Sequence, residues 1–142
     1  MSHIRFADTT IYNEHDGYSR VVKNTQYGTF SGEAWCESED RDIQNRWDGM
    51  YIAEFYCDRK IQRAKAKEFS ARARGIEHAY NILLNSLGEE DKGVKLLKRQ
   101  LDIAQREAKT ESNKYHNMAL SGRDYVGNIV TRRREFREKY RK

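Results

Sequence analysis

The N-terminal part of the chain alternates apolar and polar positions over short runs, as strands with one buried face do. Such runs cover residues 3–12 and 18–23, and the second is rich in β-branched and aromatic residues. Asp16-Gly17 between them is typical of a hairpin turn. A third run contains Gly32, which marks a bulge or a close approach of the backbone to another element. We therefore predict a small antiparallel sheet of three or four strands within residues 1–38.

A helical period replaces this alternation from residue 39 onwards. Apolar positions recur at steps of three or four up to residue 87, which predicts one long amphipathic helix. Ser38 is a candidate N-cap, and the acidic residues that follow it complement the helix dipole. Gly88 is a natural stop.

A second helical seam begins after Gly88. Ser121-Gly122 interrupts this pattern, and the part beyond is either a continuation or a separate short helix. The short turn at Gly88 makes the two long helices antiparallel neighbours. The clearest apolar positions of the seam are Val94, Leu97, Leu101, Ala104 and Ala108.

These elements predict an α+β fold in which a small antiparallel sheet is followed by two long antiparallel helices. We interpret residues 1–142 as a single domain, with the sheet in 1–38 and the helix hairpin, with a basic C-terminal extension, in 39–142. Hydrophobic residues make up 37% of the chain and charged residues 35%, and there is no proline. This composition disfavours a thick core and favours long helices in a protein that completes its core with another subunit.

Candidate metal and redox chemistry is sparse. Cys36 and Cys57 are expected to be free thiols in a reducing cytoplasm, because no signal peptide or transmembrane segment is recognisable. The four histidines have no metal-binding spacing. We therefore expect no metal, no cofactor and no membrane association.

Charge is distributed unevenly over the chain, which has a net charge of +5. Residues 59–74 hold seven basic and one acidic residue, and residues 123–142 hold eight basic and three acidic. One interpretation is a solvated helix face and a solubilising tail. The other is anion binding, with Arg59 and Arg63 as a candidate second phosphate site and the C-terminal run as an arm.

No motif for nucleotide hydrolysis, metal-dependent hydrolysis or a nucleophile elbow occurs in the sequence. Cys57 has no histidine base near it in sequence, so we expect it to be a buried small hydrophobe and the protein not to be an enzyme. The many Arg and Tyr side chains suit a nucleic acid or a free nucleotide, and the residue chemistry alone does not separate these two.

One stretch resembles a known family. It comprises Gly32-Glu-Ala-Trp-Cys-Glu-Ser-Glu-Asp40, then Arg46-Trp-Asp-Gly-Met-Tyr-Ile-Ala53, then Arg59-Lys-Ile-Gln-Arg-Ala64. A strand ending in G-x-A-x-C, an acidic helix start, G-x-x-I-A and a basic helix are similar to the Thoeris anti-defence proteins of the first type. These are bacteriophage sponges for cyclic nucleotide signals.

The resemblance implies a function. Members of that family have an N-terminal antiparallel sheet and two long helices, and they assemble through dimers into hexamers in the host bacterial cytoplasm. They bind cyclic ADP-ribose isomers without cleaving them, and some also bind cyclic oligonucleotides at a separate site. Their ligand lies between protomers, with arginines on its phosphates and aromatic and amide side chains on its base.

By residue type and place, the resemblance suggests five ligand-binding residues. Tyr115 would stack on the base, Asn117 would read its edge, and three arginines would hold the pyrophosphate: Arg20, Arg123 and Arg133. The alternatives are a basic phage protein that binds nucleic acid, which we consider less favoured, and a helical scaffold protein.

Overall fold

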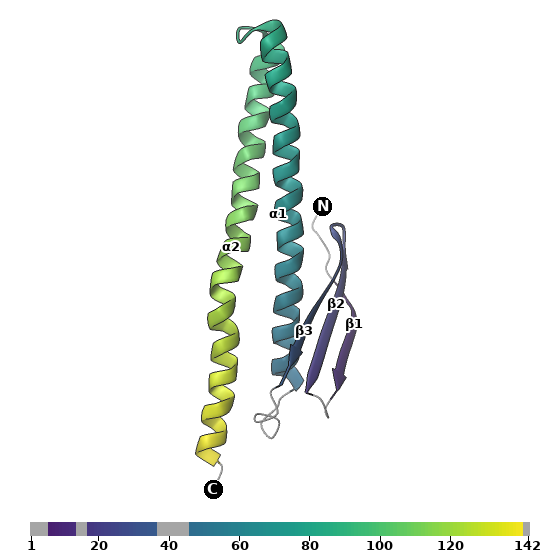
Figure 1. Ribbon diagram of the computed structural model, residues 1–142, viewed down its shortest axis with the longest axis vertical. Helices are drawn as coiled ribbons and strands as arrows, with labels where there is room; N and C mark the ends of the chain where they lie inside the picture. The colour runs from purple at the N-terminus through teal and green to yellow at the C-terminus, as the bar shows by residue number, and fades with distance from the viewer. Residues whose placement is uncertain (1–5, 14–16, 37–45, 141–142) are drawn as a thin grey trace. The chain divides into compact units, whose positions relative to one another are not determined.

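The computed structural model describes residues 6–13, 17–36 and 46–140 (Figure 1). Three strands, β1 (Phe6–Asn13), β2 (Tyr18–Thr25) and β3 (Gly28–Trp35), precede two helices, α1 (Arg46–Leu87) and α2 (Lys92–Tyr140). This order confirms the predicted α+β architecture.

The chain divides into two compact units. One, which we call the sheet unit, comprises Met1–Ile61 and Asn117–Lys142, and the other, the hairpin unit, is Gln62–His116. Both helices run through both units. The interpretation of residues 1–142 as a single domain stays a prediction.

The sheet is antiparallel in the order β1-β2-β3. Gly17 directly precedes β2 and has a φ of 62°, a left-handed conformation that glycine adopts without strain. Asp16, its predicted partner in that turn, lies outside the described residues. At the second turn the Thr25 hydroxyl donates to the Gly28 carbonyl at 2.9 Å. The register runs from Asn13 opposite Tyr18 in the first pair of strands and from Thr25 opposite Gly28 in the second.

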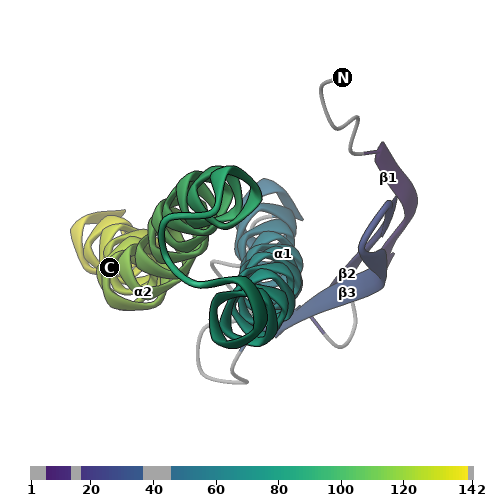
Figure 2. The same ribbon diagram turned by 90° about the horizontal axis from the view of Figure 1, so that it is seen from above.

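One face of β2 is buried against α1. Ser19, Val21 and Lys23 alternate with more exposed residues along the strand, as a sheet with one covered face requires. In the sheet unit, α1 lies between the sheet and α2 (Figure 2). The sequence therefore alternates along β2 because only one face meets a helix.

At Gly32 the backbone of the sheet approaches α1 closely. A Cβ atom at this position would lie 1.9 Å from the carbonyl oxygen of Ala53 and 2.5 Å from the backbone nitrogen of Cys57. Of the two roles that the sequence left open for Gly32, close approach is therefore confirmed. The irregularity in the sheet lies instead in β1, between Ala7 and Thr9.

Side chains of α1 also bond to the backbone of β3. The Cys57 thiol donates to the carbonyl oxygen of Phe30 at 3.3 Å, and the Lys60 ammonium donates to that of Ser31 at 2.7 Å. Consecutive carbonyls of a strand point to opposite sides, so only one of these two faces the free edge of β3. The two bonds therefore tie α1 to the backbone of β3.

The hairpin unit has a narrow core made mainly of alanine. Ala73 of α1 packs with Ala104 and Ala108 of α2, and Phe69 and Ile76 lie against them. Small side chains allow the two helix axes to approach closely. The spacing of these residues explains why the seam of α2 is the clearest helical pattern in the sequence.

The turn between the helices follows the sequence signals. Gly88 has a left-handed φ of 80°, and its N–H donates to the Leu84 carbonyl at 2.9 Å, which confirms the predicted stop. The Asp91 carboxylate accepts from the N–H groups of Gly93 and Val94, at 2.8 and 3.1 Å. Asp91 is thus the N-cap, and α2 begins at Lys92.

The sequence interruption at Ser121-Gly122 does not break α2, which is continuous to Tyr140. Instead, Gly122 makes room for an aromatic ring, because a Cβ there would lie 2.4 Å from Cε1 of Phe55. The continuation was therefore the right alternative. The candidate cap Ser38 lies outside the described residues.

Candidate functional site

The residues suggested for ligand binding are spread over both units. In the sheet unit, Arg20 lies on the face of β2 turned away from α1, with its Nε 3.8 Å from Glu33 Oε1. Asn117 and Arg123 are exposed on α2. The carbonyl of Asn117 accepts a hydrogen bond from the Ser121 hydroxyl at 2.8 Å, and its side chain has no hydrogen bond within the described ranges.

Arg133 has a structural partner. Its Nε donates to the carboxylate of Asp48, in the first turn of α1, and both side chains are partly buried. Arg133 therefore links the end of α2 to the start of α1. An arginine already engaged by a carboxylate has fewer donors left for a phosphate.

Tyr115 is half-buried in the hairpin unit, and its ring centre lies 5.8 Å from that of His116. It is two residues from Asn117, which places the two side chains about 200° apart around the helix. The structure therefore does not bring the expected stacking residue and the expected amide onto one helix face.

The basic block of α1 resolves into residues with different partners. The guanidinium of Arg59 lies 5.3 Å from the ring centre of Tyr56, in cation–π range, whereas Arg63 is exposed. Lys60 bonds to β3, and Lys65 lies 3.4 Å from a carboxylate oxygen of Glu111. Arg59 and Arg63 thus stay candidates for a second anion site, while two of their basic neighbours serve internal contacts.

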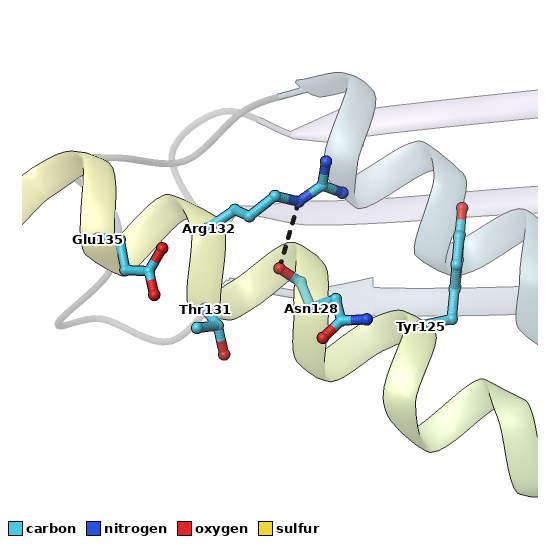
Figure 3. A pocket seen from close by; sticks show the side chains of 5 residues that line it. All are labelled: Tyr125, Asn128, Thr131, Arg132 and Glu135. Atoms are coloured by element: carbon cyan, nitrogen blue, oxygen red, sulfur yellow. Dashed lines mark hydrogen bonds between the residues drawn. The ribbon is translucent and has the colours of Figure 1, made fainter.

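A hollow on α2 in the sheet unit combines the groups that nucleotide recognition needs. Its volume is about 430 Å³. Figure 3 shows its residues following one another along the helix, with Arg132 reaching back over the turn that carries Asn128. The lining residues are Tyr125, Asn128, Thr131, Arg132 and Glu135.

The side chains of the hollow are only partly held in place. The Tyr125 ring is 5.4 Å from the Phe55 ring and is 40% exposed. Arg132 Nε donates to the Asn128 carbonyl at a long 3.4 Å, which leaves its terminal nitrogens for another acceptor. The arrangement offers an aromatic face, an amide and a guanidinium to one ligand, with the Glu135 carboxylate at the far end.

None of the five ligand residues suggested by sequence lines this hollow. In the sequence, Arg132 is distinguished only as part of a basic run. The missed signal is the spacing of Tyr125, Asn128 and Arg132, since steps of three and four place an aromatic, an amide and an arginine on one helix face.

Cys57 lies in the packing between α1 and β3 rather than in a cleft. Burial, together with the charge of Asp58, raises the pKa of its thiol, so the thiolate is disfavoured. Within residues 6–13, 17–36 and 46–140, no three His, Cys, Asp or Glu side chains gather as metal ligands would. In the same part of the chain, neither helix has a stretch long and apolar enough to cross a bilayer.

No family model, curated protein or solved structure matches this chain. The family resemblance described from the sequence therefore stays a prediction, and the candidate site rests on its own geometry.

Proposed function

We propose that the protein is a phage anti-defence sponge, which binds cyclic nucleotide immune signals and holds them without cleaving them. The ligand class is cyclic ADP-ribose isomers, and cyclic oligonucleotides are further candidates. The place of action is the host bacterial cytoplasm. The observation that carries the proposal is the α2 hollow, which presents Tyr125, Asn128 and Arg132 on one face.

Each of these groups has a role in holding a nucleotide. The Tyr125 ring stacks on the base, the Asn128 amide bonds to its edge, and the Arg132 fork engages a phosphate in a bidentate manner. Glu135 accepts from a ribose hydroxyl, because a carboxylate beside a phosphate would be repulsive. The hollow, at about 430 Å³, lies within the roughly 300–1,000 Å³ typical of small-molecule sites.

The hollow has only one wall, since every lining residue comes from α2. Tight capture of a charged nucleotide requires a largely desolvated site. A second copy of the chain would supply the other wall, which agrees with the homo-oligomer, dimers assembling to a hexamer, that the resemblance implies. The proposed sponge is therefore an oligomer with ligands between subunits.

A release assay tests the proposal. The purified protein is incubated with cyclic ADP-ribose isomers and cyclic oligonucleotides, washed, and heat-denatured, and the released compounds are identified by mass. Intact cyclic nucleotide in stoichiometric amount supports the sponge. A linear product would make the protein an enzyme and refute the proposal, and release of nothing would refute ligand binding.

Two variants locate the site. Arg132→Ala should reduce retained ligand by about tenfold or more, because it removes a charge-assisted hydrogen bond. Arg99→Ala is the matched control, since Arg99 is an exposed arginine on α2 in the hairpin unit. Equal loss in both variants would indicate a general charge effect rather than a site at the hollow.

The alternative function is nucleic-acid binding, and one observation favours it. Three basic residues of α1 are exposed: Arg63, Lys67 and Arg74. The second and third follow the first by four and by eleven residues, which places all three on one helix face. None of the three has an ion pair within the described part of the hairpin unit. If they contact three phosphates of duplex DNA, the logarithm of the binding constant should fall with that of salt concentration with a slope of about −3. Binding of the sponge's ligand should depend on salt far less.

A further inference from the structure

No element within residues 6–13, 17–36 and 46–140 covers the face of the sheet turned away from α1, and this face is partly aromatic. Ser19, Val21 and Lys23 point toward α1, so the alternating residues of β2 point to the other side. On that side the rings of Tyr18 and Trp35 are paired across β2 and β3, with centres 4.9 Å apart. Trp35 is nevertheless 64% exposed, which is unusual for a residue of its size.

The next cross-strand pair on the same face is charged. Arg20 lies opposite Glu33, and the 3.8 Å between Arg20 Nε and Glu33 Oε1 is too long for a hydrogen bond. Both side chains are about 40% exposed, at 41% and 38%. The pair leaves the face electrically neutral, which argues against a polyanion as its partner.

The arrangement of the two pairs is self-complementary. Tyr18 and Arg20 stand on β2, and Trp35 and Glu33 stand opposite them on β3. Consider a second sheet laid on the first, related to it by a two-fold axis that runs parallel to the strands and midway between β2 and β3. This axis places β2 of each copy opposite β3 of the other copy. Each Arg20 would then face a Glu33 of the other copy, and each Tyr18 would face a Trp35.

We propose that this sheet face docks onto the same face of a second copy of the chain, with Arg20 against Glu33 and Tyr18 against Trp35 across the two-fold axis. Such contacts are isologous, as in most protein dimers. Packed sheets lie about 10 Å apart and keep their strands within about 30° of one another, so side chains of this size interdigitate. This interface would associate copies of the chain, as the proposed sponge requires, but it lies on the sheet and does not itself supply the second wall of the α2 hollow.

The contact is small. Two strands of eight residues cover roughly 27 by 10 Å in plan. The area of this face is well below the roughly 800 Å² that each partner buries in a standard stable interface. We therefore expect a weak dimer, with a dissociation constant in the micromolar range, when this face acts alone.

Charge reversal tests the interface without any ligand. Sedimentation of the full chain at about 1–200 μM, the range suited to a small interface, should show concentration-dependent association. In Glu33→Arg, Arg20 of each copy faces an arginine at position 33 of the other copy, and in Arg20→Glu, Glu33 faces a glutamate at position 20. Because like charges then meet, each variant alone should associate at least tenfold more weakly. An equimolar mixture of the two should restore association, because each sheet then meets one of opposite charge.

The mixing experiment separates this interface from other causes. Glu77→Arg, an exposed position on α1, changes the net charge equally and should leave association unchanged. Circular dichroism identifies any variant that fails to fold. Association of Glu33→Arg equal to that of the wild type, or a mixture no stronger than its components, would overturn the inference. A dimer that retains no nucleotide would refute the proposed function and leave the interface standing.

Discussion

The side-chain amide of Gln62 on α1 donates two hydrogen bonds to Glu111 on α2, one to a carboxylate oxygen at 2.7 Å and one to the backbone carbonyl at 3.0 Å. Both residues are buried, and the other carboxylate oxygen of Glu111 lies 3.4 Å from the Lys65 ammonium. Lys114 adds a hydrogen bond at 3.2 Å. Displacing one helix along the other would leave these groups unsatisfied, so the cluster fixes the register within the hairpin unit.

Replacing Glu111 should make stability in acid less dependent on pH. Burial alone would raise the pKa of Glu111, but hydrogen bonds from Gln62 and Lys114 and the charge of Lys65 outweigh it and lower the pKa. A lowered pKa in the folded state means that the stabilisation is complete above the unfolded value of about 4.3 and is lost as pH falls through the folded value. At pH 7, Glu111→Gln should cost about 1.5–3 kcal/mol, because it removes charge-assisted bonds.

Urea unfolding at pH 7 and pH 3 measures this effect. The difference in unfolding free energy between the wild type and Glu111→Gln should shrink at pH 3, since this pH lies below the unfolded pKa of Glu111 and part of the stabilisation that its charge provides is then lost. A difference that is equal at both pH values would show that the charge of Glu111 contributes nothing.

Alanine at Gly32 should destabilise the sheet unit. The new Cβ would lie 1.9 Å from a backbone carbonyl oxygen of α1, so the helix or the strand must move. Overpacking of this kind costs about 1–3 kcal/mol, measured as a lower midpoint of urea or thermal unfolding. The matched control is Gly75→Ala, because a Cβ there has nothing within 4 Å. It should instead stabilise α1 by up to about 1 kcal/mol through helix propensity.

The two cysteines should differ sharply in reactivity. Cys57 is fully buried, and its raised thiol pKa disfavours the reactive thiolate, whereas Cys36 is partly exposed at the end of β3. A thiol reagent such as iodoacetamide should therefore modify Cys36 in the native protein and Cys57 only after unfolding. Peptide mapping by mass spectrometry would contradict this if both residues were labelled at the same rate.

Much of the fold follows from local signals in the sequence. The alternation of β2, the turn glycines and the stop at Gly88 depend on residues near one another in the chain, and each was readable. The sequence leaves open whether the helix continues through Gly122, because the role of this glycine is set by Phe55, 67 positions away. The spacing of apolar residues along one helix carries no information about a partner so far away in the sequence.

The candidate site was harder to predict for the same reason. The sequence shows only that Lys60 and Lys65 are basic. In the fold, Lys60 donates a hydrogen bond to a carbonyl of β3, and Lys65 forms an ion pair with Glu111. Tyr115 and Asn117 suit a ligand by residue type, but two positions apart they lie on different faces of the helix. Tyr125, Asn128 and Arg132 share one face, so the helical period is the information that separates the two sets.

Arg133 and Arg123 give a comparison that separates a structural arginine from a ligand-binding one. Arg133 pairs with Asp48 in a partly buried contact, whereas Arg123 is exposed. Arg133→Gln and Asp48→Asn should each lower the unfolding free energy, and the double variant should reveal a coupling of about 0.5–1 kcal/mol. Arg123→Gln should change stability by less than about 0.5 kcal/mol.

The same variants in the release assay decide what these arginines do for a ligand. If Arg133 serves mainly to hold α2 to α1, Arg133→Gln and Asp48→Asn should affect retained nucleotide equally, because both break the same ion pair. If Arg133 also holds a phosphate, Arg133→Gln should lose ligand while Asp48→Asn keeps or gains it, since the guanidinium is then released from its carboxylate. We expect the first result, because the Asp48 contact already uses the Nε donor of Arg133.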